Sequence, residues 1–170
     1  LSGIEHACLD ILGKSLDVPV WRLLGGSCRD RIRVYGGTGG NTPEEYAANA
    51  KARVAEGFTA VKCTPFPDPV RYVDSPAMTD SIVARVAAIR EAVGPSIDIG
   101  IDFHRAVSPA MARLLLKELE PYRPMFVEEP THPENVDALL EITRSTTIPI
   151  ATGERNTTRW GFRELVEKKA

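Results

Sequence analysis

Three carboxylates recur at a constant spacing in the second half of the chain. Asp102, Glu128 and Glu154 each follow a short apolar run, and 26 residues separate each acid from the next (128 − 102 and 154 − 128). If they end neighbouring parallel strands, their charges converge and repel one another unless a cation lies between them. Oxygen donors favour a hard ion, Mg²⁺ before Ca²⁺. The spacing therefore predicts a Mg²⁺ site with these three ligands.

A histidine follows the first of these acids. His104 comes two residues after Asp102 in the stretch DIGIDFHRAV, residues 98–107. Residues two apart in an extended chain point to the same side, so the imidazole is expected beside the carboxylate. Such a histidine can transfer protons in an active site. It can equally end a strand and bond a loop carbonyl, and the residues alone leave both interpretations open.

Strand-like runs alternate with helix-like runs along the chain. Strands are expected at 31–37, 58–63, 97–102, 125–130 and 148–154. Helices are expected at 2–16, 41–57, 75–94, 108–122, 135–146 and 158–170. This alternation predicts an α/β fold with a parallel sheet, either doubly wound or a (β/α)8 barrel. The glycine cluster at 36–41 does not match the phosphate-binding fingerprint of doubly wound folds.

The composition is that of an ordinary globular protein. The chain has 170 residues, of which 43% are hydrophobic and 26% charged, and its net charge of −2 gives no reason to expect nucleic acid or a membrane surface as partner. No apolar run approaches the roughly 18 residues of a membrane span, and the N-terminus lacks signal-peptide features. The three cysteines are scattered. We therefore expect a cytoplasmic protein with reduced thiols and a small-molecule partner.

The motifs in combination resemble a known family. The stretches DFH, VEEP and TGER, at these spacings, resemble the enolase superfamily in its mandelate racemase and muconate lactonising branch. The stretches KELEPYRPMFVEEP and SGIEHACLDILGKSLDVPVWRLLGG are most similar to the acid-sugar dehydratases that act on galactonate or gluconate. The resemblance implies a partial (β/α)8 TIM-type barrel of about five β/α units. Residues 1–29 would be the end of a capping domain with a linker helix, and 30–170 the first part of the barrel; most of the capping domain and the last strands would be missing.

The resemblance also implies roles for individual residues. Asp102, Glu128 and Glu154 would bind Mg²⁺, His104 would be the general acid, and Lys62 would be a catalytic or substrate-contacting lysine. Further substrate contacts would be Thr64, Glu129 and Arg155. The loop at 64–76 is expected to contribute to specificity. Arg155 and Arg159, which flank the last ligand, could pair with the carboxylates or meet the substrate.

The reaction implied is the dehydration of a sugar acid to a 2-keto-3-deoxy acid, which makes the enzyme a hydro-lyase. Thr64 stands where racemases carry a second lysine, which favours elimination over racemisation. A racemase, epimerase or cycloisomerase of the same superfamily, or an inactive truncated copy, remain alternatives. The general base is expected on later strands, so we expect this chain alone to be inactive and the full-length parent to be a homo-oligomer. Which sugar acid is used does not follow from the sequence.

Overall fold

The computed structural model describes residues 2–66 and 75–170, so most of the loop expected to contribute to specificity lies outside the described residues. The chain divides into two units, Leu1–Arg33 and Val34–Ala170. The first holds α1 (Ser2–Ser15) and α2 (Val20–Leu23), which pack together. The division falls four residues after the expected boundary at 29–30. That the first unit ends a capping domain stays a prediction.

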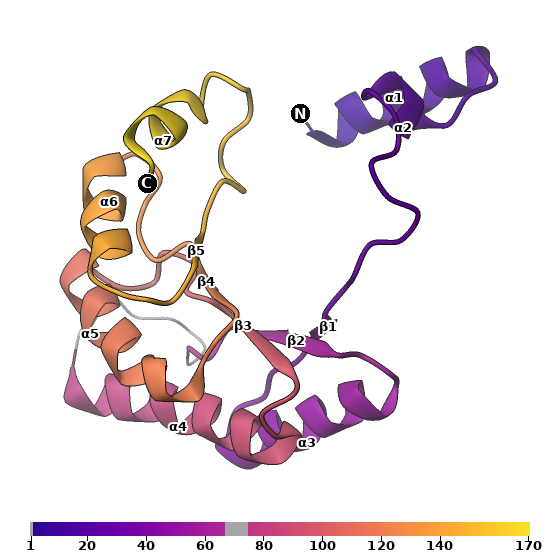
Figure 1. Cartoon of the computed structure of the whole chain (residues 1–170). Helices are drawn as coiled ribbons and strands as arrows, with labels where there is room; N and C mark the ends of the chain where they lie inside the picture. Colours follow the sequence, from indigo (N-terminus) through magenta and orange to yellow (C-terminus); the bar gives the residue numbers. More distant parts are fainter. Residues whose placement is uncertain (1, 67–74) are drawn as a thin grey trace. The chain divides into compact units, whose positions relative to one another are not determined.

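The second unit is built on a parallel sheet. Its strands are β1 (Gly36–Gly37), β2 (Ala60–Cys63), β3 (Asp98–Asp102), β4 (Phe126–Glu128) and β5 (Ile150–Ala151) (Figure 1). Their order in the sheet is the order in the chain, β1-β2-β3-β4-β5, and every neighbouring pair is parallel. A doubly wound sheet reverses its order at a switch point, whereas successive units of a (β/α)8 barrel follow one another. The sheet therefore has the topology of a barrel segment.

The two outer strands are shorter than expected. Of the strand expected at 31–37, only Gly36–Gly37 is paired, and it has a neighbour on one side alone. The strand expected at 148–154 ends at Ala151, because Gly153 has a φ of 125° and its N–H donates to a side chain instead of a further strand. The expectation that Glu154 ends the fifth strand is therefore wrong.

Helices follow the strands and cover one face of the sheet (Figure 1). They are α3 (Pro43–Ala55), α4 (Pro76–Val93), α5 (Pro109–Leu119) with the short η1 (Glu120–Tyr122), α6 (Val136–Arg144) and α7 (Arg163–Lys168). Thr42, Ser75 and Ser108 each cap a helix by accepting the N–H three residues later, and each precedes a proline at the first helical position. The last helix covers only part of the expected range 158–170, because residues 159–162 form turns.

Alternation along the strands separates the core from the site. Val61, Ile99, Ile101 and Val127 are fully buried and join a core with residues of α3–α6. Their neighbours in sequence point to the opposite face. We call the end of the sheet where the strands finish the carboxyl edge, and the end where they begin the amino edge.

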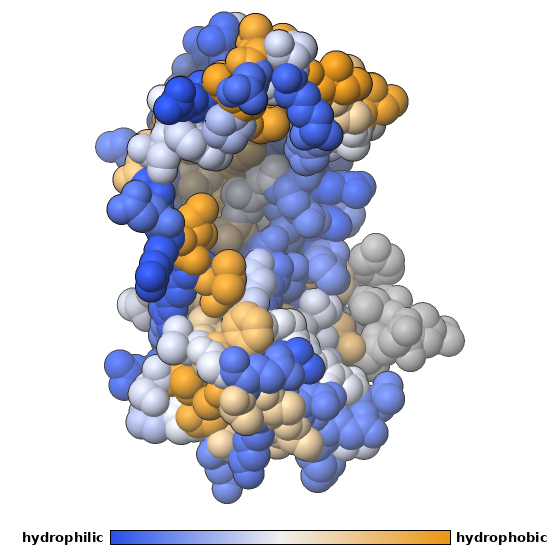
Figure 2. Space-filling model, turned by 90° about the vertical axis from the view of Figure 1, so that its right-hand side faces the viewer, coloured by the Kyte–Doolittle hydropathy of each residue, from blue (hydrophilic) through white to orange (hydrophobic). Residues whose placement is uncertain are grey.

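The surface also carries hydrophobic residues. Figure 2 shows one face, on which hydrophobic patches (orange) lie among hydrophilic ones (blue). Large exposed hydrophobic side chains include Trp21, Tyr35, Leu114 and Trp160. Among the described helices, none combines the length and the apolar character that crossing a bilayer requires.

Candidate active site

A lysine and two carboxylates meet on three consecutive strands at the carboxyl edge. Asp102 of β3 and Glu128 of β4 are direct register partners, and Lys62 of β2 lies beside them. The Lys62 Nζ is 2.8 Å from Asp102 Oδ2 and 2.5 Å from Glu128 Oε2. Asp102 is only 2% exposed. One ammonium group therefore offsets the repulsion between two neighbouring carboxylates.

The surroundings keep Lys62 charged. Burial alone would lower its pKa, but hydrogen bonds and attraction from Asp102 and Glu128 outweigh burial, so the pKa of Lys62 is raised above its ordinary value. The centroid of the Tyr35 ring lies 5.7 Å from the same Nζ, which adds a cation–π contact. In this arrangement Lys62 is an ammonium group suited to attract an anion, because a base would have to be uncharged.

His104 lies beside Asp102, as predicted. Its backbone N–H donates to Asp102 Oδ1 at 2.9 Å, and its Nε2 is 3.1 Å from Asp102 Oδ2. The route is not the expected extended alternation, since β3 ends at Asp102 and His104 has a φ of 47°. The side-chain partner is a carboxylate, so the alternative of a loop carbonyl is wrong. Half of the imidazole side chain is exposed, which leaves it accessible to a substrate.

A second charged group links the loops after β3, β4 and β5. Arg105 Nη1 lies 2.9 Å from Glu129 Oε2 and 2.5 Å from Glu154 Oε1. The other oxygen of Glu129 accepts hydrogen bonds from Thr152 Oγ1 at 3.0 Å and Gly153 N at 2.9 Å. Glu129 is fully buried with both oxygens occupied. It therefore holds the neighbouring loop in place, and its contact with a substrate stays a prediction.

The three predicted metal ligands are not gathered at one point. Asp102 and Glu128 are adjacent, whereas Glu154 lies three residues beyond β5 and pairs with Arg105. Within residues 2–66 and 75–170, no three His, Cys, Asp or Glu side chains are grouped closely enough to hold a metal ion. The donor chemistry of the adjacent pair nevertheless suits Mg²⁺, since two carboxylates on neighbouring strands already share one positive charge.

The remaining predicted contacts lie around this cluster. The Thr64 carbonyl, just after β2, accepts a 2.7 Å hydrogen bond from the Tyr46 hydroxyl, and the residue is half-buried. Arg155 is exposed, and it makes no ion pair or hydrogen bond with the described part of the chain. The Arg159 guanidinium lies 4.6 Å from the Trp160 ring. Neither arginine pairs with the carboxylates in the described residues.

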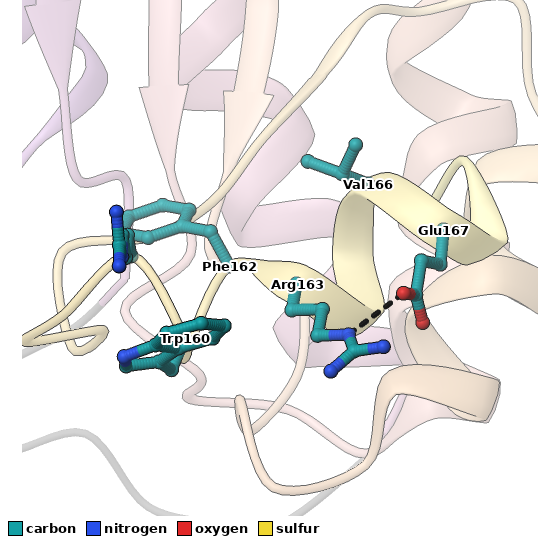
Figure 3. A pocket seen from close by; sticks show the side chains of 6 residues that line it. Trp160, Phe162, Arg163, Val166 and Glu167 are labelled. Atoms are coloured by element: carbon teal, nitrogen blue, oxygen red, sulfur yellow. Dashed lines mark hydrogen bonds and ion pairs between the residues drawn. The ribbon is translucent and has the colours of Figure 1, made fainter.

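A separate pocket lies at α7. It has a volume of about 500 Å³ and is lined by Arg159, Trp160, Phe162, Arg163, Val166 and Glu167. Figure 3 shows the ion pair between Arg163 and Glu167 beside the aromatic side chains. A Cβ added to Gly153 would lie only 2.6 Å from Cε1 of the Phe162 ring. The ring therefore packs closely against the loop after β5. The pocket contains none of the predicted catalytic or metal-binding residues.

The sequence patterns did not predict that Arg105 and Tyr35 belong to the site. The sequence does contain an electrostatic indication for Arg105. Three carboxylates at one edge of the sheet require cations nearby, and Arg105 directly follows His104. Tyr35 carried no such signal, because its contact with Lys62 depends on the pairing of β1 with β2. Both contacts join residues from different strands or loops.

Comparison with known proteins identifies the family of the chain. The enolase C-terminal domain-like family matches residues 45–170. A D-galactonate dehydratase from Ralstonia pickettii (strain 12J) is 43% identical over 98% of the chain and 44% of its own length. A mandelate racemase/muconate lactonizing enzyme from Jannaschia sp. CCS1 is 41% identical, with a TM-score of 0.87 over 98% of this chain and 47% of its own.

A third similar structure is an enolase from Pantoea ananatis with bound D-gluconate and Mg. It is 29% identical, with a TM-score of 0.78 over 95% of this chain and 46% of its own. The chain thus spans less than half the length of the proteins it matches. These matches confirm the resemblance and the barrel-type α/β fold. The chain belongs to the enolase C-terminal domain-like family.

Proposed function

We propose that this chain supplies part of the active site of a Mg²⁺-dependent sugar-acid dehydratase. The observation that carries the proposal is the cluster of Lys62, Asp102, His104 and Glu128 at the ends of consecutive strands. Support comes from the 43% identity to a D-galactonate dehydratase and from the similar structure that holds D-gluconate and Mg. The preferred substrate class is an aldonic acid, a carboxylate bearing neighbouring hydroxyl groups.

The metal would be held by carboxylates. Asp102 and Glu128 are the adjacent pair, and Glu154 would join them by leaving Arg105. When bound, Mg²⁺ supplies electrostatic stabilisation for the negative charge that develops on the substrate carboxylate. The Glu129–Arg105 pair holds the loop that carries Glu154, so it sets the range of positions open to that carboxylate.

Lys62 and Thr64 would contact the substrate. The Lys62 ammonium is less than one-fifth exposed, so its attraction for a carboxylate is only weakly screened by water. Thr64 adds a hydroxyl two residues later, just after β2 ends, that can bond a sugar hydroxyl. Arg155, exposed on the loop after β5, is a further contact for the polar end of the substrate.

His104 would protonate the leaving group. The substrate loses the proton on the carbon next to its carboxylate, and the bond from the following carbon to its hydroxyl breaks. A protonated His104 donates a proton to that hydroxyl, which departs as water. Asp102 orients the imidazole through its contacts with the backbone N–H and Nε2 of His104. The resulting enol becomes a 2-keto-3-deoxy acid. The base that takes the first proton is expected on strands outside this chain.

A hybrid protein tests this function. In the hybrid, this chain replaces the aligned 167-residue segment of the R. pickettii D-galactonate dehydratase, and the unaltered enzyme is the positive control. We expect the folded hybrid to convert D-galactonate or another aldonate to its 2-keto-3-deoxy product only when Mg²⁺ is present. The 170-residue chain alone is expected to show no turnover.

Two results would decide against the proposal. A folded hybrid that converts no member of an aldonate panel contradicts a dehydratase. A hybrid that exchanges the α-proton with deuterated solvent and yields an epimer without losing water supports the racemase or epimerase alternative. Folding is checked by size-exclusion chromatography and circular dichroism before either result is interpreted.

A further inference from the structure

Arg85 is a buried cation on α4 whose partners lie on two loops at the carboxyl edge. The residue is only 8% exposed. Its Nη1 donates to the Pro65 carbonyl at 3.3 Å, and its Nη2 donates to the Asn41 carbonyl at 3.1 Å. Pro65 follows β2 and Asn41 follows β1. The Ser81 hydroxyl, 2.5 Å from Nη1, holds the guanidinium from within the helix. One side chain thus joins α4 to two loops.

Stability alone does not account for an arginine at this position. Its helix neighbours Ile82, Val86 and Ile89 are fully buried in the core. Among the described residues no carboxylate pairs with Arg85, and its Nε has no hydrogen-bond partner there. Burying a guanidinium under these conditions costs desolvation that an apolar residue would avoid. What the arginine provides across elements, and an apolar residue would not, is the pair of bonds to the loop carbonyls.

The loop that Arg85 holds continues directly from two of the proposed substrate contacts, Lys62 in β2 and Thr64 just after it. Lys62 and Thr64 lie just before Pro65, and their backbones are tethered as well. The Thr38 N–H donates to the Lys62 carbonyl at 2.8 Å, and the Tyr46 hydroxyl donates to the Thr64 carbonyl at 2.7 Å. The Arg85 guanidinium also lies 5.9 Å from the Tyr46 ring. These contacts form one network around the end of β2.

We propose that Arg85 is a positioning residue, which fixes the backbone that carries Lys62 and Thr64 and so places both side chains for a sugar acid. This inference rests on the proposed function. Arg85 acts through the loop and does not touch the substrate. A planar guanidinium reaches two carbonyls at once, whereas a lysine ammonium offers a single point of attachment. The Arg85→Lys variant should therefore retain only part of the effect.

Kinetics on the hybrid provide the first test, with Arg90 as the matched control. Arg90 lies on the same helix, but it donates to the Gly94 and Ile97 carbonyls at the amino edge. We expect Arg85→Met to raise KM about tenfold with little change in kcat, and Arg85→Lys to fall between it and wild type. Arg90→Met lowers the fraction of folded enzyme, which reduces the apparent kcat and leaves KM unchanged.

The Cys63 thiol provides a second test that needs no activity. Cys63 lies between Lys62 and Thr64 and is buried, whereas Cys8 and Cys28 are exposed and are replaced by serine for this measurement. In the 170-residue chain, Arg85→Met should speed the reaction of Cys63 with a thiol reagent about tenfold. The rate should depend weakly on urea, because only the end of β2 and the loop that follows it open. In Arg90→Met the rate should follow the global free energy of unfolding.

The two measurements separate the inference from the function. An unchanged KM in a folded, active Arg85→Met hybrid overturns the positioning role. So does a Cys63 rate that responds to Arg85→Met no more than to Arg90→Met at equal global stability. A wild-type hybrid that folds without turnover refutes the proposed function, and the Cys63 rates then decide alone whether Arg85 fixes this loop.

Discussion

The two edges of the sheet use charged groups in different ways. At the amino edge, the Arg90 guanidinium donates to the carbonyls of Gly94, Ile97, Tyr122 and Arg123. There too, Glu120 accepts hydrogen bonds from Thr146 and Thr147. At the carboxyl edge, charged side chains mainly contact one another. Charges bonded to backbone carbonyls and hydroxyls hold elements together, whereas charges bonded to other charges can exchange partners when a substrate or ion arrives.

The two edges also differ in backbone conformation, with more left-handed residues at the carboxyl edge. His104, Arg105 and Glu129 have φ values of 47°, 60° and 48°, and all three follow strands at the carboxyl edge. Arg123 is the counterpart near the amino edge, with a φ of 50°. Left-handed conformations of such residues cost free energy and persist only where surrounding contacts hold them. Their concentration around the Lys62 cluster fits the rule that barrel enzymes place chemistry at the carboxyl edge and stability at the amino edge.

The largest difference between the edges should appear along β3 itself, which carries an aspartate at each end. Asp102→Asn removes a charge from the carboxyl edge, and we expect the turnover of the hybrid to fall about 10³-fold. Asp98→Asn makes the same change at the amino edge and should leave turnover within about twofold. Steady-state kinetics with saturating Mg²⁺ measures both. Equal losses in the two variants would remove the distinction between the edges.

Next in size is the effect of the proposed general acid. His104→Asn should lower kcat about 10²-fold and leave the urea midpoint nearly unchanged, since the side chain is half exposed. His132→Asn is the control, because the His132 side chain is exposed and its Nδ1 lies 4.0 Å from Glu134 Oε2. Wild-type kcat in His104→Asn would remove the general-acid assignment without affecting the metal ligands.

Substitutions at the amino edge should lower the free energy of unfolding and leave turnover unchanged. Arg90→Met leaves four carbonyls without their donor, and we expect the free energy of unfolding to fall by about 2 kcal/mol. Arg53→Met, which loses only an exposed pair with Glu56, should cost less than about 0.5 kcal/mol. Urea denaturation of the 170-residue chain measures both. A KM change in the Arg90→Met hybrid would show that the amino edge also shapes the site.

The smallest effect concerns pH at the amino edge. Hydrogen bonds from the backbone and side chain of Thr147 and from Thr146 lower the pKa of Glu120. A lowered folded-state pKa means that this stabilisation is present above the ordinary glutamate pKa and disappears as the pH falls through the lowered value. The difference in urea midpoint between wild type and Glu120→Gln should therefore shrink as the pH falls below the ordinary glutamate pKa. A difference that grows on acidification would contradict this.

Much of the architecture could be predicted from local patterns. Helix-like runs indicated α3, α4 and α5, and a capping residue followed by proline begins each of these helices; apolar runs indicated β2, β3 and β4. These signals are local because capping and burial act over a few residues. The end of β5 could not be predicted this way, because it depends on a hydrogen bond from Gly153 to Glu129, which lies in the loop after a different strand, β4. The same contact explains why equal spacing along the chain misplaced Glu154.

The order of β/α units and the chemical types of the site residues follow from the sequence, since periodicity, caps and the recurring acids are properties of the chain read along its length. Only the tertiary structure decides which charges meet. Lys62 contacts Asp102 and Glu128, Glu154 contacts Arg105, and Arg85 reaches two loops from a helix. Each pairing depends on strand register and on how neighbouring loops turn, and electrostatic partners are chosen by distance in space.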